Sequence, residues 1–302
     1  METRATGVYR ERAERRRRTR GAGEARGDGW QRTEEDEQLL RLATRYSTLT
    51  LHQAAYACWG GRIETARRRV RLMVEAGLLL RSADVRWART VLWPTERGAR
   101  VADTGLSAPR PPGERLLDRL AVADVGIALE AHGYAVLSER EIHAAEAVPG
   151  RPAQLLETLR VPRVPGVPTS ARRGETLAVP AGARAVHWPD LIVVEPTPRF
   201  LIAVEVELTP EAPAALRAIL RAYRQAQRSV LYLATEPVAR QLQGGPGPDG
   251  TWIDGAAQEA GLRPAGAPLP DGVGHLSVRL FAAVDPAVAR RAVQQAARLR
   301  GG

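Results

Sequence analysis

The chain of 302 residues contains no lysine, so all 44 of its basic residues are arginines. No lysine amine is therefore available to an active site in this protein. Alanine, glycine and proline are abundant at the same time, which is the composition that a GC-rich genome tends to produce. An individual arginine is thus weak evidence for a role that needs its planar guanidinium group.

Cysteine is almost absent as well. Cys58 is the single cysteine, which excludes a disulfide within the chain, and no group of cysteines and histidines has the spacing of a zinc site. The N-terminal segment is charged and lacks the apolar core of a signal peptide, and no run of about 18 apolar residues could span a membrane. We therefore expect a soluble, cytoplasmic protein without a membrane partner.

Basic residues outnumber acidic ones, with a formal net charge of +10 and a pI of about 10.8. This excess favours a polyanionic partner, and double-stranded DNA is the partner that we expect. The length predicts two domains. Residues 1–33 are arginine-rich and have too few apolar groups to offset the entropy of ordering, so we expect a disordered basic arm. Such an arm either neutralises phosphates or is a solvated tail.

Residues 34–104 have the pattern of three helices followed by two strands. In the third predicted helix Ile63, Ala66, Val70 and Met73 recur at spacings of three and four, after a break at two glycines. This order is typical of a winged helix-turn-helix domain, whose third helix enters the major groove of DNA. The alternatives are a solvated arginine-rich face and a winged helix that contacts protein. The candidate DNA-binding residues lie on the outer face of that helix and beside the predicted wing tip: Arg62, Thr65, Arg67, Arg68, Arg71, Arg86 and Arg89.

A second pattern follows the proline-rich residues 105–113, which predict a linker. Residues 114–284 predict a mixed-sheet α/β domain, in which residues 148–186 show little periodicity and predict an irregular insertion. We expect strands at 190–194 and 200–208 and a helix at 212–227. Residues 285–302 predict a basic C-terminal helix. The predicted fold class is therefore α/β with two domains.

Carboxylates interrupt one of these apolar strands. Because strand side chains alternate, Glu205 and Glu207 share one face, and the valines between and before them face the core. An antiparallel hairpin with residues 190–194 would bring Asp190 beside both glutamates. Three converging carboxylates repel one another unless they bind a cation, and oxygen ligands favour Mg²⁺ or Mn²⁺. The alternative is a solvent-facing strand end that leads into the next helix. Glu130 and Glu139 are further acids that we interpret as surface residues, and His187 as a loop histidine.

These residues resemble the motif of the PD-(D/E)xK nuclease superfamily, with Pro189–Asp190 on one strand, Glu205–Val206–Glu207 on the next and a helix after it. The resemblance implies that Asp190 and Glu205 hold the metal ion and that Asp190, Glu205 and Glu207 are catalytic. The superfamily normally has a lysine where this chain has Glu207, although some of its restriction endonucleases have an acid there. Arg217 or Arg221 would be a weaker substitute, because arginine does not act as a base near neutral pH.

Over residues 34–240 the chain resembles the replication-relaxation family of actinobacterial plasmid and mobile-element proteins. The matching segments are "WPTERG", "RLAVADVGIALEAHGY" with "SEREI" after it, and "PD…VEVELT…LRAILRAY". The resemblance implies a role in plasmid replication, relaxation or mobilisation, together with other proteins of those processes. Three functions stay open: a DNA-binding accessory protein without a cofactor, a Mg²⁺- or Mn²⁺-dependent DNA endonuclease, and a transcription regulator.

Overall fold

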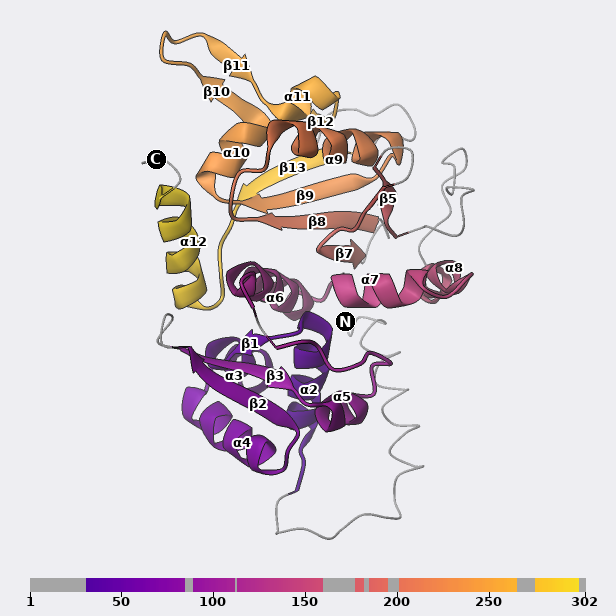
Figure 1. Ribbon diagram of the computed structural model, residues 1–302, viewed down its shortest axis with the longest axis vertical. Helices are drawn as coiled ribbons and strands as arrows, with labels where there is room; N and C mark the ends of the chain where they lie inside the picture. Colours follow the sequence, from indigo (N-terminus) through magenta and orange to yellow (C-terminus); the bar gives the residue numbers. More distant parts are fainter. Residues whose placement is uncertain are drawn as a thin grey trace. The chain divides into compact units, whose positions relative to one another are not determined.

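The computed structural model (Figure 1) describes residues 31–84, 89–111, 113–159, 177–181, 185–194, 201–264 and 275–298. The chain divides into two units, residues 1–34 and residues 35–302. All but the last three residues of the predicted basic arm lie outside the described residues, and so does most of the predicted insertion at 148–186. None of the helices in the described part of the chain has the length and apolar character that crossing a bilayer requires.

The N-terminal part of the second unit contains the three helices and two strands that the sequence predicts, with one further short strand and one further helix. The helix that starts at Leu51 begins at a recognisable signal. The hydroxyl of Thr50 accepts a hydrogen bond from Gln53 N, and the Gln53 side chain accepts one from Thr50 N, which is a capping box. The sheet has the antiparallel order β1-β3-β2. The elements are α2 (Glu34–Tyr46), β1 (Leu49–Thr50), α3 (Leu51–Trp59), α4 (Ile63–Glu75), β2 (Leu79–Asp84), β3 (Arg89–Pro94) and α5 (Glu96–Ala102).

The C-terminal part is built on a six-stranded mixed sheet with the order β12-β13-β9-β8-β7-β4. Strand β7 is antiparallel to both of its neighbours, β4 and β8, whereas β8, β9, β13 and β12 run parallel to one another. The α/β class predicted from the sequence is therefore confirmed. The strands are β4 (Ala135–Ser138), β5 (Val179–Pro180), β6 (Val186–His187), β7 (Leu191–Val194), β8 (Leu201–Glu207), β9 (Ser229–Ala234), β10 (Gly244–Pro246), β11 (Trp252–Asp254), β12 (Arg263–Pro264) and β13 (His275–Leu280). The helices are α6 (Leu116–Ala131), α7 (Glu139–Glu146), α8 (Arg151–Thr158), α9 (Pro213–Gln225), α10 (Glu236–Gln243), α11 (Ala256–Ala260) and α12 (Pro286–Arg298).

Strand β8 is buried on both faces. Ala203 belongs to a core that includes Leu216, Leu220 and Tyr223 of α9. Val204, which points the other way, is also fully buried, and α6 contacts this strand. A strand that is covered on both sides is expected to be continuously apolar, so a glutamate within it needs a polar partner.

One sequence expectation fails at the end of β4. The sequence predicts a strand through residues 134–141, but the strand ends at Ser138 and α7 begins at Glu139. Ser138 and Glu141 form a capping box, and this local hydrogen bonding outweighs the strand propensity of the preceding residues. The predicted irregular segment likewise contains α8, whose proline at the start suits the first turn of a helix.

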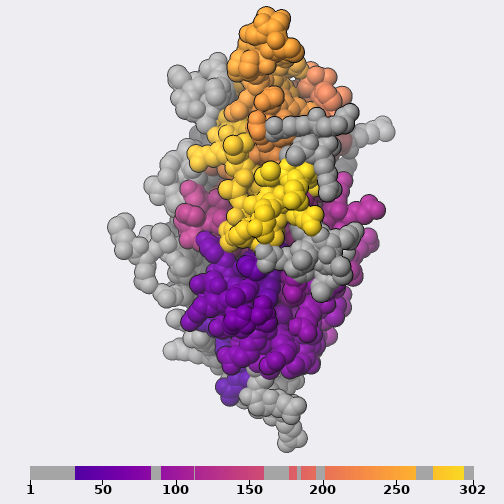
Figure 2. Space-filling view, turned by 90° about the vertical axis from the view of Figure 1, so that its left-hand side faces the viewer, coloured from indigo at the N-terminus to yellow at the C-terminus, as the bar shows by residue number. Residues whose placement is uncertain are grey.

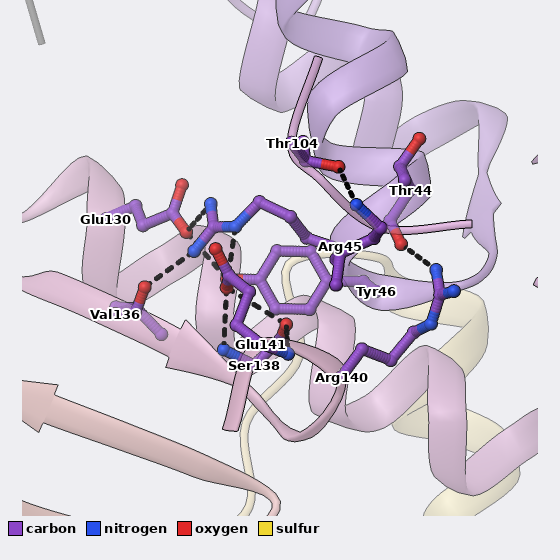
Figure 3. A network of polar contacts seen from close by, with 10 residues as sticks. Thr44, Arg45, Tyr46, Thr104, Glu130, Val136, Ser138, Arg140 and Glu141 are labelled. Atoms are coloured by element: carbon purple, nitrogen blue, oxygen red, sulfur yellow. Dashed lines mark hydrogen bonds and ion pairs between the residues drawn. The ribbon is translucent and has the colours of Figure 1, made fainter. Parts of the chain in front are cut away.

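The segments predicted as two domains are joined by buried polar contacts (Figure 3). Arg45 of α2 donates to Glu130 at 2.7 Å, to Glu141 at 2.9 Å and to the carbonyl of Val136 at 2.6 Å. Gly126 of α6 packs against the ring of Tyr46 in α2. A Cβ atom at position 126 would lie 2.3 Å from the Tyr46 hydroxyl oxygen and would clash with it, so this close approach of the two helices requires glycine.

The C-terminal helix makes a second connection. The Thr50 hydroxyl donates to Asp285 at 2.6 Å, and Asp285 accepts from the backbone of Ala287 in the first turn of α12. Figure 2 shows α12, in yellow, at the surface beside the indigo residues. The segments around Thr50 and Asp285, which are far apart in the sequence, are thus fixed to each other within one unit.

Candidate functional site

Asp190 and Glu205 lie next to each other at one end of the β7–β8 hairpin. Leu191 pairs with Val204, and one step beyond this pair stand Asp190 and Glu205. The Asp190 carboxylate accepts a hydrogen bond from Val206 N at 2.8 Å. The hairpin pairing predicted from the sequence is therefore confirmed, and it brings Asp190 to the strand that carries both glutamates.

Glu205 is buried, with 6% of its surface exposed. Its Oε1 atom accepts a hydrogen bond from the Tyr223 hydroxyl of α9 and lies 2.6 Å from Nε2 of His187 in β6. The rings of His187 and Tyr223 meet edge to face, with centroids 5.6 Å apart. The expectation that the acids emerge together from the strand is thus wrong for Glu205, because α9 covers that face of β8. Glu207 is half-buried.

Burial and the neighbouring charges raise the pKa of two of these carboxyl groups, Asp190 and Glu207. Burial, followed by the charge of Glu205, raises the pKa of Asp190 well above its usual value. Burial, followed by the charges of Glu211 and Glu205, raises the pKa of Glu207 to about 8. Burial alone would lower the pKa of His187, but its hydrogen bond to Glu205 and the nearby carboxylates raise it overall. The imidazole is therefore disposed to carry the positive charge that balances Glu205.

Mg²⁺ and Mn²⁺ prefer oxygen ligands such as carboxylates. Within the described ranges, no three histidine, cysteine or carboxylate side chains are grouped so that they could hold a metal ion. Oε1 of Glu205 already has two polar neighbours, and an oxygen of Asp190 accepts from the backbone. In the structure these carboxylates are satisfied by hydrogen-bond donors, and the metal ion implied by the nuclease resemblance stays a prediction.

Two residues of this site were missed or misinterpreted in the sequence. His187, interpreted as a loop histidine, lies in β6 and contacts Glu205. Tyr223 lies on the buried face of α9. It stands seven residues after Leu216 and three after Leu220, and this helical spacing is the sequence signal that predicts its burial. A tyrosine on a buried helix face needs a partner for its hydroxyl, and Glu205 is that partner.

The other candidate residues make their side-chain contacts with groups other than these acids. Glu130 accepts from Arg45 and Tyr46 at the contact with α2. Glu139 is exposed and lies 3.6 Å from His143. Arg217 pairs with Glu259 of α11 at 3.1 Å, and Arg221 lies one turn further along α9 on the exposed surface. In the described part of the chain, none of these four side chains is hydrogen-bonded to Asp190, Glu205 or Glu207.

The second candidate site is the outer face of α4. Arg67 and Arg71 expose 59% and 60% of their side chains and pair with Glu64 and Glu75 of the same helix, at 2.5 and 3.8 Å. Arg68 is exposed as well and forms no ion pair with any described residue. Arg62 is exposed with its Nε donating to the Trp59 carbonyl, and Thr65 is half-buried. Of the predicted wing residues, Arg86 and the side chain of Arg89 lie outside the described residues.

Comparisons with protein-family models, with curated proteins and with solved structures gave no match to this chain. The resemblances to the replication-relaxation family and to the PD-(D/E)xK nucleases accordingly stay predictions. Functional inference depends on the two sites just described.

Proposed function

We propose that this protein binds duplex DNA through the outer face of α4, as an accessory protein in the replication, relaxation or mobilisation of a plasmid or mobile element. The observation that carries the proposal is the separation of side chains on this helix. Ala66, Val70 and Met73 are buried, while Arg67, Arg68 and Arg71 are exposed on the opposite side. Guanidinium groups are well suited to phosphate oxygens and to the edge of guanine.

The surroundings of α4 support a winged helix-turn-helix interpretation. The helix follows α2 and α3 and precedes the antiparallel pair β2–β3, which is the order of that domain. Arg69 pairs with the buried Asp36 of α2, with Nε 3.0 Å from Oδ1. This fourth arginine therefore holds α4 against α2, and it is not one of those available to DNA.

The ion pairs that Glu64 and Glu75 form with the arginines of this face can be exchanged for contacts with phosphate. The pairs of Arg67 with Glu64 and of Arg71 with Glu75 are exposed, and an exposed ion pair contributes roughly 0–1 kcal/mol. A phosphate can replace the glutamate at little cost, because both partners stay in water until DNA arrives. Arg68 has no such ion pair to exchange among the described residues.

The experiment is a titration of fluorescently labelled duplex DNA, read by anisotropy at several salt concentrations. The double variant Arg67→Ala, Arg68→Ala should bind more weakly, and the slope of log affinity against log salt should fall by about 2 in magnitude, because each phosphate contact releases about 0.9 counterions. The control is Arg151→Ala, Arg240→Ala, which removes two exposed arginines from the other helices α8 and α10. Equal losses in both variants would show that binding depends on net charge alone and would overturn the assignment to α4.

Metal-dependent DNA cleavage is the second candidate function, and the adjacency of Asp190 and Glu205 is the observation that favours it. We treat it as the alternative because Oε1 of Glu205 already contacts Tyr223 and His187. Incubation of supercoiled plasmid with Mg²⁺ or Mn²⁺ separates the two. Nicking by the wild type that Glu205→Gln abolishes would establish the endonuclease, and an inert wild type leaves the accessory DNA binder. A transcription regulator would also bind DNA, and a reporter assay on the bound sequence would identify it.

A further inference from the structure

A pocket of about 450 Å³ lies between α9 and α11, on residues that neither the acids nor α4 involve. Its volume is within the range of small-molecule sites, on the order of 300–1,000 Å³. The lining is polar and is formed by Arg221, Arg224, Gln225, Gln227, Glu259 and Ala260. Two guanidinium groups one turn apart at the same opening indicate an anionic ligand.

Neither arginine of this pocket forms an ion pair within the described residues, and the position of Arg224 is fixed by its neighbours. Arg224 donates to the carbonyl of Ala260 at 3.1 Å. It lies so close to Gly261 that a methyl group there would meet the guanidinium at 2.7 Å, so the end of α11 fixes the position of this side chain. Glu259 is the acid of the lining, and Arg217 from outside the lining pairs with it. Arg221 forms no ion pair within the described residues, and the pocket therefore has a net positive charge.

Gln227 supplies a second, independent indication of a ligand. Its Oε1 atom is buried and accepts no hydrogen bond from the described part of the protein, and a buried acceptor without a donor is unfavourable. Its backbone has a φ of 52°, the left-handed conformation in which glycine or asparagine is usual after a helix. A glutamine in that conformation is unfavourable locally, and strain of this kind is common where a side chain is required by a bound molecule.

We propose that this pocket binds a phosphorylated ligand of nucleotide size, with the phosphate on Arg221 and Arg224 and the rest of the ligand against Gln227. A planar guanidinium pair matches the oxygens of a phosphate, and the side chain of Gln227 belongs to the same lining. The site is separate from α4 and from Glu205, so it stands whether or not the proposed DNA binding does. The phosphate can belong to a free nucleotide or to the backbone of a nucleic acid, and the experiment distinguishes these sources.

The test is isothermal titration calorimetry of the full chain with adenosine 5′-monophosphate, adenosine and inorganic phosphate. We expect saturable binding of adenosine 5′-monophosphate, weaker binding of phosphate and none of adenosine. Arg221→Ala should weaken the nucleotide at least tenfold, and Arg240→Ala, an exposed arginine of α10, should leave it unchanged. Gln227→Gly removes the side chain and suits the positive φ, so the protein should stay folded while its preference for the nucleotide over phosphate disappears.

A duplex oligonucleotide with 5′-hydroxyl ends identifies the source of the phosphate. If Arg221→Ala weakens the duplex and no mononucleotide binds, the phosphate recognised is that of the nucleic-acid backbone. The proposal is overturned if neither probe binds saturably, or if binding of both is the same in the wild type and in Arg221→Ala. Loss of duplex binding in Arg67→Ala, Arg68→Ala with nucleotide binding intact would show that the two sites are independent.

Discussion

Replacing Arg45 with alanine should destabilise the protein more than any other single loss of an arginine on α2. The Arg45 side chain is 15% exposed, and its partners Glu130 and Glu141 are 28% and 22% exposed. Removing one member of a buried ion pair costs about 3–5 kcal/mol, because the remaining charges lose their partner. Because these glutamates keep some contact with water, we expect the lower end, about 3 kcal/mol. This is a large part of a total stability of about 5–15 kcal/mol.

The measurement is urea unfolding followed by tryptophan fluorescence. Arg41→Ala is the matched control: Arg41 stands one turn earlier on the same helix and pairs with Glu37 at 3.9 Å, with both side chains exposed. That change should cost less than about 1 kcal/mol. Because Arg45 joins α2 to the sheet part of the protein, Arg45→Ala should also separate one transition into two. A free energy of unfolding for Arg45→Ala within 1 kcal/mol of that for Arg41→Ala would refute the reasoning.

Two further predictions concern buried polar groups. Burial, opposed by hydrogen bonds and aided by the charge of Asp285, raises the pKa of Asp124 to about 7. The folded state therefore binds the Asp124 proton more tightly than the unfolded state does. The free energy of unfolding should consequently fall as pH rises from about 4 to about 7. Asp124→Asn should flatten that dependence in urea midpoints, and an unchanged slope would contradict it. Tyr223→Phe removes a donor to the buried Glu205 and should cost about 1–3 kcal/mol, whereas Tyr56→Phe, on an exposed tyrosine, should be neutral in the same assay.

Local patterns predicted the local structure well. The spacing of Ala66, Val70 and Met73 correctly predicts the buried face of α4, and a threonine, the residue type that commonly caps helices, stands directly before α3 at Thr50. The hairpin that brings Asp190 to Glu205 also followed from two apolar runs and a proline-rich turn. These features depend on residues close in sequence, and their physical causes, side-chain capping and helical or strand periodicity, are visible in the sequence itself.

The partners of Glu205 were not predictable in the same way. Alternation along β8 gives the face on which Glu205 lies, but not what covers that face, because Tyr223 arrives from α9 and His187 from β6. A sheet that is covered on one side would have left the acid in solvent, and a sheet that is covered on both sides requires donors for it. The choice between these outcomes depends on tertiary packing, which here supplies Tyr223 and His187 as the partners of Glu205.

A continuous series of bonds leads from the arginine face of α4 to the acids. Arg69 of α4 pairs with Asp36 of α2, and Arg45 at the other end of α2 donates to Glu141. Glu141 caps α7 at Ser138, and the next backbone N–H, that of Glu139, donates to the Asp190 carbonyl at 3.0 Å. Each step is a charged or capping contact rather than a flexible segment. If DNA binds to α4, these contacts fix α4 relative to the strand end at Asp190. The position of the DNA relative to Asp190 would then depend on these contacts more than on the predicted linker at 105–113.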